Sequence, residues 1–318
     1  MGTLAEMLST PLGVIEWFVY LLAAVMFVIG LHLMNSPKTA RKGNMVSAIG
    51  MVFAVAMAFI VLFAGEASNG FKHGVAVIVL IVGIVIGAVA GVVSAKKVKM
   101  TDMPQLVSVF NTVGGGAAAL VALNDILTSA ETPSIVVLIT AGLGIMIGSV
   151  TFSGSLIAAG KLQGIKWVKK LSLPGKGFWN ILFVVLTIVS FVMLCVQPNQ
   201  RLLWSILTTV FALCYGLVFV IPIGGADMPV VISVLNACTG TAVAMSGLAI
   251  NNIALIVAGA LVGAAGVTLS IAMSKAMNRP LLSVLAGGFG GSNSAAGAGE
   301  GLEGTMKETS ADDLAVQL

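Results

Sequence analysis

Long runs of apolar residues, separated by short polar segments, make up most of the chain. Each run is at least about 20 residues long, which is the length that an α-helix needs to cross a bilayer core of roughly 30 Å. A helix also satisfies its own backbone hydrogen bonds in lipid. We therefore predict an all-α fold, a polytopic membrane helix bundle of nine transmembrane helices. The predicted spans are 14–34, 44–64, 74–95, 104–124, 134–160, 178–197, 202–223, 228–250 and 253–274.

Composition agrees that lipid is the solvent of this chain. Apolar residues make up 58% of its 318 residues and charged residues 9%, whereas soluble domains have about a quarter charged residues. The net charge of +4 is better explained as a signal of membrane orientation than as a nucleic-acid footprint. The three cysteines have no paired spacing, so we expect neither a disulfide nor a metal site.

The loops differ strongly in their content of Lys and Arg. Thirteen basic residues follow the odd-numbered spans, whereas the alternate loops carry only Lys72 and Arg201. Because cytoplasmic loops are the basic ones, we expect the N-terminus outside and the C-terminus in the cytoplasm. The thirteen are Lys38, Arg41, Lys42, Lys96, Lys97, Lys99, Lys161, Lys166, Lys169, Lys170, Lys176, Lys275 and Arg279.

An eleven-residue segment occurs twice. Residues 101–111 recur as residues 226–236, with Asp, Met, Pro, Ser, Val and Asn in register and with Asp102 and Asp227 separated by 125 residues. Both copies begin on the predicted cytoplasmic side, so we predict a parallel internal repeat of two three-helix modules, spans 3–5 and 7–9. Regularly spaced glycines would let these helices pack closely. They are Gly83, Gly87, Gly91, Gly142, Gly144, Gly148, Gly259, Gly263 and Gly266.

Each copy of the repeat opens with an aspartate followed by a proline in the first helical turn. Such an aspartate can cap the free N–H groups and complement the helix dipole, which is a purely structural role. For Asp102 the structural and functional interpretations have equal weight. For Asp227 the functional one is favoured, because residues 224–227 contain no basic residue that would pair with it.

Each copy also carries an asparagine deep inside its span. At a rise of 1.5 Å per residue, Asn111 and Asn236 lie about 13 Å from their aspartates, near the middle of the bilayer. Ser108 and Ser233, three residues earlier, share their helix faces. These groups either hold helices together at about 0.6 kcal/mol apiece or line a hydrated path. No Asp, Glu, Lys or Arg lies mid-span. The titrating group of a proton path would therefore lie at one end of the path or on a partner subunit.

The character of the chain changes after Arg279. Residues 287–297 have the composition of a flexible linker, and the last residues look like the start of a capped helix. We therefore expect residues 1–280 to form the membrane domain and 281–318 a linker with the truncated start of a cytoplasmic domain. A match to the dinucleotide fingerprint at 299–304 follows no strand, so we reject it.

Five motifs resemble the beta subunit of proton-translocating NAD(P) transhydrogenase. They are Arg-Lys-Gly-Asn at 41–44, Lys-Lys-Val-Lys-Met-Thr-Asp-Met-Pro at 96–104, Gly-Ser-Val-Thr-Phe-Ser-Gly-Ser at 148–155, Gly-Gly-Ala-Asp-Met-Pro-Val-Val at 224–231 and Lys-Ala-Met-Asn-Arg at 275–279. The resemblance implies a membrane domain that conducts protons inward while hydride passes from NADH to NADP+. It places NADP(H) on a soluble domain after the linker and NAD(H) on the alpha subunit, so this chain alone would bind neither and would hold no catalytic residue.

The resemblance also implies partners and residue roles. The expected partners are alpha subunits with additional membrane helices and a second protomer, in a bacterial inner membrane. Positions implicated in proton conduction or in coupling to the NADP(H) domain are Asp227, Asn236, Gly259, Gly263, Gly266, Ser270, Lys275 and Arg279. Asn111 stands where well-known relatives have a histidine. Some split-subunit relatives carry that histidine on an alpha-subunit helix, and we expect the same here.

A function of another class competes with this one. A secondary transporter would carry a small solute through the repeat interface, with the glycines clearing space for it. The glycine-rich tail and the parallel repeat count against a transporter. A purely structural membrane anchor is a weaker alternative, because it does not explain the duplicated mid-bilayer amides.

Overall fold

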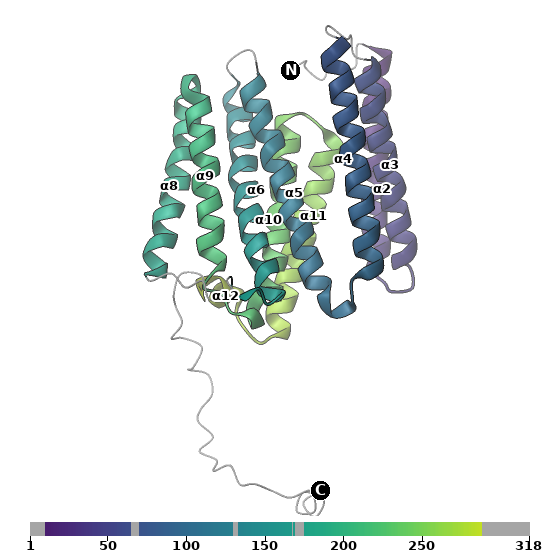
Figure 1. Cartoon of the computed structure of the whole chain (residues 1–318). Coiled ribbons are helices and arrows are strands. Elements are labelled where there is room, and N and C mark those ends of the chain that lie inside the picture. Colours follow the sequence, from purple (N-terminus) through teal and green to yellow (C-terminus); the bar gives the residue numbers. More distant parts are fainter. Residues whose placement is uncertain (1–9, 65–69, 130–132, 167, 169–174, 288–318) are drawn as a thin grey trace, which may run out of the picture.

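The computed structural model describes residues 10–64, 70–129, 133–166, 168 and 175–287. Within these residues every regular element is a helix, and nine helices are long and apolar enough to cross a membrane (Figure 1). The all-α class and the number of spans are therefore confirmed for this part of the chain. Most of the predicted linker, the fingerprint match and the last helical turns lie outside the described residues.

The long helices run back and forth along the bundle. They are α2 (Pro11–Met34), α3 (Ala40–Ala64), α4 (Gly70–Lys97), α5 (Met103–Thr128), α6 (Ile135–Leu162), α8 (Lys176–Val196), α9 (Arg201–Val220), α10 (Met228–Ala249) and α11 (Ile253–Ala276). Short 3-10 turns, Met100–Asp102 and Gly225–Asp227, precede α5 and α10. A short helix, α12 (Leu281–Gly287), follows α11.

Local sequence explains where several of these helices begin and end. The side chains of Thr10, Ser134 and Asn252 accept hydrogen bonds from backbone N–H groups in the first turns of α2, α6 and α11. The seventh predicted span ran to residue 223, but α9 ends at Val220. The reason is Pro222, which lacks the N–H group that would continue the helical hydrogen bonds.

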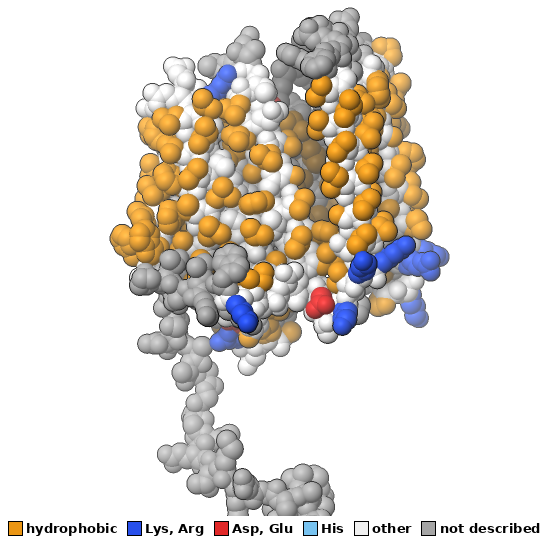
Figure 2. Space-filling view, viewed as in Figure 1, with side chains coloured by type: hydrophobic (Ala, Val, Ile, Leu, Met, Phe, Trp, Pro, Cys, Tyr) orange, Lys and Arg blue, Asp and Glu red, His pale blue; other side chains and the backbone are white. Residues whose placement is uncertain are grey.

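Four helices form the centre of the bundle. α10 packs against α11, α6 and α5, and α5 packs against α6. On one side α9 packs against α6 and α8, and on the other α2 pairs with α3 and touches α11 (Figure 1). Apolar side chains cover the flanks of the bundle in the view of Figure 2, as expected for a surface that faces lipid.

A buried apolar cluster closes the end of the bundle at which α12 lies. It joins Ile157 of α6, Val220 of α9, Met228 of α10 and Val284 of α12. Residues 281–287, which we had expected to open a linker, therefore form a helix that packs on the bundle. The domain boundary near residue 280 stays a prediction.

The helix packing does not confirm the predicted three-helix modules, and the internal repeat remains a prediction. α4 makes only sparse contacts with the other described helices. A Cβ atom added at Gly83, Gly87 or Gly91 would meet nothing within 4 Å. The expectation that these three glycines close-pack against neighbouring helices of the chain is therefore wrong. Regularly spaced glycines permit close helix packing, but they do not determine which helix packs against them.

Candidate functional site

Asn111 joins the two copies of the repeated segment. Its side-chain Nδ2 on α5 donates a hydrogen bond of 3.3 Å to the carbonyl oxygen of Ile232 on α10, and the residue is only 4% exposed. Ile232 lies one helical turn before Asn236. The structure thus brings the amide of one copy onto the turn that carries the amide of the other.

Asn236 differs from Asn111 in its surroundings. It is half-buried, and its amide makes no hydrogen bond within the described part of the chain. An amide in a membrane needs a polar partner, because an unsatisfied polar group in apolar surroundings is costly. Asn236 is thus the amide of the pair that remains available to water or to a group on another subunit.

The serines of the predicted polar band hold neighbouring helices together. Ser108 donates to the carbonyl oxygen of Ser155 on α6 at 2.7 Å, and Ser233 donates to that of Gly266 on α11 at 3.2 Å. Ser270 donates to the same Gly266 oxygen at 2.7 Å. In each copy the serine therefore binds a carbonyl of the next long helix.

Glycines bring α10 and α11 into backbone contact. A Cβ atom at Gly259 would lie 2.7 Å from the carbonyl oxygen of Gly240, and one at Gly266 would lie 2.7 Å from the nitrogen of Ala237. Gly263 contributes its nitrogen and Cα to the close contact at Gly240. The backbones of α10 and α11 are therefore in close contact at Gly259, Gly263 and Gly266, and no solute fits between these two helices there.

Asp227 is paired with Arg279. Both carboxylate oxygens accept from Nη1 of Arg279, at 2.5 and 2.6 Å, and the side chains are 16% and 40% exposed respectively. The prediction that Asp227 has no counter-ion was wrong. It considered only the loop 224–227, whereas α10 and α11 form a hairpin that returns Arg279 to the start of α10.

The capping interpretation, which had equal weight for Asp102 and was the less favoured one for Asp227, does not hold. Neither Asp102 nor Asp227 makes a side-chain hydrogen bond to the helix that it precedes. In both cases a 3-10 turn ends at the aspartate. Asp102 is exposed, whereas Asp227 turns to Arg279. The repeated aspartates therefore have different surroundings.

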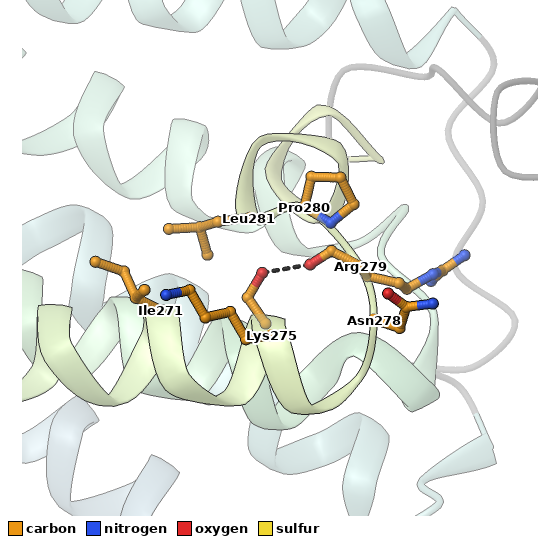
Figure 3. A pocket seen from close by; sticks show the side chains of 7 residues that line it. Ile271, Lys275, Asn278, Arg279, Pro280 and Leu281 are labelled. Atoms are coloured by element: carbon orange, nitrogen blue, oxygen red, sulfur yellow. Dashed lines mark hydrogen bonds between the residues drawn. The ribbon is translucent and has the colours of Figure 1, made fainter.

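Lys275 and Arg279 line an open pocket of about 430 Å³ between the end of α11 and the start of α12. Figure 3 shows the Lys275 side chain extending towards Ile271 and the Arg279 guanidinium directed away from Leu281. The hydroxyl of Ser274 donates to the carbonyl oxygen of Arg279 and so fixes the turn between the helices. The two basic residues thus lie where the chain leaves the bundle.

Comparison with known proteins decides the family. A family model described as NAD(P) transhydrogenase beta subunit matches residues 16–318. The chain belongs to this family. Two curated relatives, both named NAD(P) transhydrogenase subunit beta and both from Rhodospirillum rubrum, are 39% identical over 305 residues. The match covers 93% of this chain and 63% of each relative, so the chain spans under two thirds of the length of these beta subunits.

Two polar contacts between helices of this beta-subunit chain have no counterpart among the residues singled out from the sequence. Lys161 of α6 binds backbone carbonyls at the end of α9, and Ser246 of α10 donates to the carbonyl oxygen of Ala118 on α5 at 2.9 Å. Lys161 was treated only as one of the basic residues that set orientation. Its position directly at the end of the apolar run 134–160, ahead of the other basic residues of the loop, was the available signal.

Proposed function

We propose that this chain forms the proton-conducting membrane part of an NAD(P) transhydrogenase. In this proposal protons move inward while hydride passes from NADH to NADP+ elsewhere in the complex. Family membership supports the enzyme complex as a whole. NADP(H) and NAD(H) bind to its soluble parts, and this chain alone binds neither.

The ion pair between Asp227 and Arg279 is the observation that carries the proposal. Asp227 stands directly before α10, the helix of Asn236, and Arg279 stands between α11 and α12. A rearrangement of α12 or of Arg279 therefore reaches the start of α10 through this ion pair. Coupling needs such a link, because the affinity or state of one site must depend on that of the other.

Asn236 and Asp227 have the central roles in the proposed path. A proton arrives from outside, is passed through water at Asn236, and leaves beside Asp227. Asn111 fixes α5 against the turn that carries Asn236, and Ser108 and Ser233 hold the surrounding helices. Ser270 shares the Gly266 carbonyl with Ser233. Asp102, exposed at the start of α5, stays a secondary candidate. The titrating group comes from an alpha-subunit helix.

Surface charge supports the proposed orientation. In Figure 2 the Lys and Arg side chains gather mainly at the end of the bundle where α12 lies. A bacterial inner membrane with this end in the cytoplasm satisfies the positive-inside rule. Lys275 and Arg279 then face the nucleotide-binding domains, and the complex assembles as a dimer of protomers with alpha subunits.

The experiment is an Asn236→Leu variant of the complete complex in sealed vesicles. Proton-linked hydride transfer should fall at least about tenfold, since a positioned proton-transfer group typically contributes 10²–10⁴-fold. Asn124→Leu, at an exposed amide on α5, is the matched control and should retain coupled turnover. Full coupled turnover in Asn236→Leu, with assembled complex, would rule out the proposed path.

A further inference from the structure

Lys161 makes a three-way contact with the end of α9. It is the penultimate residue of α6, and its Nζ donates to the carbonyl oxygens of Val220 at 3.2 Å, Ile223 at 2.8 Å and Ile221. An ammonium group has three N–H donors. One ammonium group can therefore bind several carbonyls of α9 and its turn at once.

The chemistry of a helix end explains why a lysine suits this position. The last carbonyls of a helix lack intrahelical partners and carry the negative end of the helix dipole. Pro222 prevents α9 from continuing, and Val220, Ile221 and Ile223 are all buried. Water therefore has little access to these carbonyls, and a lysine side chain supplies both the donors and the positive charge.

The turn that Lys161 holds leads directly to Asp227. Residues 221–224 connect α9 to the 3-10 turn Gly225–Asp227. The backbone of this segment is bound by Lys161, and the carboxylate at its end is bound by Arg279. Ile157 and Ala158, one turn before Lys161, pack in the same cluster as Ile223 and Met228. The segment is thus held to α6 on one side and to the end of α11 on the other.

We propose that Lys161 is a positioning residue that fixes the turn between α9 and α10 so that Asp227 meets Arg279. The proposal rests on the proposed role of Asp227 in proton exit and coupling. In this proposal the end of α6 helps to keep Asp227, at the proposed proton exit, in contact with Arg279, which precedes α12. Lys161 acts through the turn and does not itself carry the proton.

Lys166 offers a matched control. It lies five residues after Lys161 on the same connection, it is exposed, and it carries the same charge. If Lys161 serves only the orientation of the chain in the membrane, Lys161→Met and Lys166→Met should behave alike. If it positions the turn, only Lys161→Met should have an effect.

The first test follows the turn itself by electron paramagnetic resonance. A spin label at Ala226→Cys, in a chain whose three cysteines are replaced by alanine, reports the mobility of the exposed turn. Lys161→Met should raise this mobility, Lys161→Arg should raise it less, and Lys166→Met should leave it unchanged. A reference label at Ser36→Cys, in the turn between α2 and α3, should not respond. Unchanged mobility at Ala226 in folded Lys161→Met would overturn the proposal.

The second test is a double-mutant cycle in the complete complex. Lys161→Met should lower proton-linked hydride transfer about tenfold, as expected for losing hydrogen bonds to a charged group. In an Asp227→Asn background, Lys161→Met should cause no further loss of proton-linked hydride transfer, because the carboxylate that Lys161 positions is already absent. Multiplicative losses would show that Lys161 acts elsewhere. Full activity of Asp227→Asn alone would refute the proposed role of Asp227, which the spin-label result does not require.

Discussion

Arg279 binds both carboxylate oxygens of Asp227 through one nitrogen, Nη1, across 52 residues of sequence. Since Arg279 is 40% exposed, solvent screening keeps the contribution of the pair to folding stability at about 1 kcal/mol or less. Its importance therefore lies in geometry. It connects the start of α10 to the segment between α11 and α12.

We expect that exchanging the charges of Asp227 and Arg279 will show that their pair connects the two helix ends. Asp227→Arg and Arg279→Asp should each lower coupled hydride transfer about tenfold or more, because a like-charge pair then separates the two helix ends. The double variant should recover part of the loss. The measurement is proton-linked turnover in vesicles with melting temperature as the control. Equal activity of the double and the worse single variant would contradict a direct pairing.

Asn111 provides a second prediction. Asn111→Leu removes the interhelical hydrogen bond to Ile232 and should cost about 0.6 kcal/mol of stability, the average for such contacts in membranes. The melting temperature should therefore fall only slightly. Coupled activity should fall less than in Asn236→Leu, because Asn111 fixes a helix while Asn236 stays open to water. An equal or larger loss in Asn111→Leu would reverse the roles that we assign to the two amides.

The glycine contacts predict opposite outcomes for one substitution at two places. Gly259→Ala should destabilise the bundle by about 1–3 kcal/mol, because its new methyl group meets the backbone of Gly240 and Ala244. Gly87→Ala on α4 should be tolerated in the isolated chain, since nothing lies within 4 Å of the added atom. Thermal unfolding of both variants in detergent provides the measurement. Equal melting temperatures would contradict the close contact of α10 and α11.

Two neighbouring residues on α12 test whether this helix belongs to the bundle. Val284 is 3% exposed within the apolar cluster, whereas Leu282 is 79% exposed. Val284→Asp should release α12, because burying Val stabilises by about 1.5–3 kcal/mol and a carboxylate cannot occupy its site. Leu282→Asp should leave α12 docked. Hydrogen exchange over residues 281–287 distinguishes them, and equal protection in both variants would contradict the packing.

The sequence by itself determined the helices of this protein. Length and apolarity suffice to predict a membrane span, because each helix in lipid must satisfy its backbone within itself. The nine spans were therefore found within a few residues of their ends in the described part of the chain. The motifs likewise indicated the transhydrogenase beta-subunit family that comparison established.

Only the tertiary structure decided which helix faces meet. The sequence offered similar glycine spacings on α4 and on α11, yet only those on α11 contact another helix of the chain. In lipid, apolar surface does not drive helices together as it does in water, so the apolar pattern does not reveal the neighbours. The pairing of Asp227 with Arg279 and the capping of α9 by Lys161 depend on those neighbours. These contacts join residues more than 50 positions apart, and no local pattern specifies them.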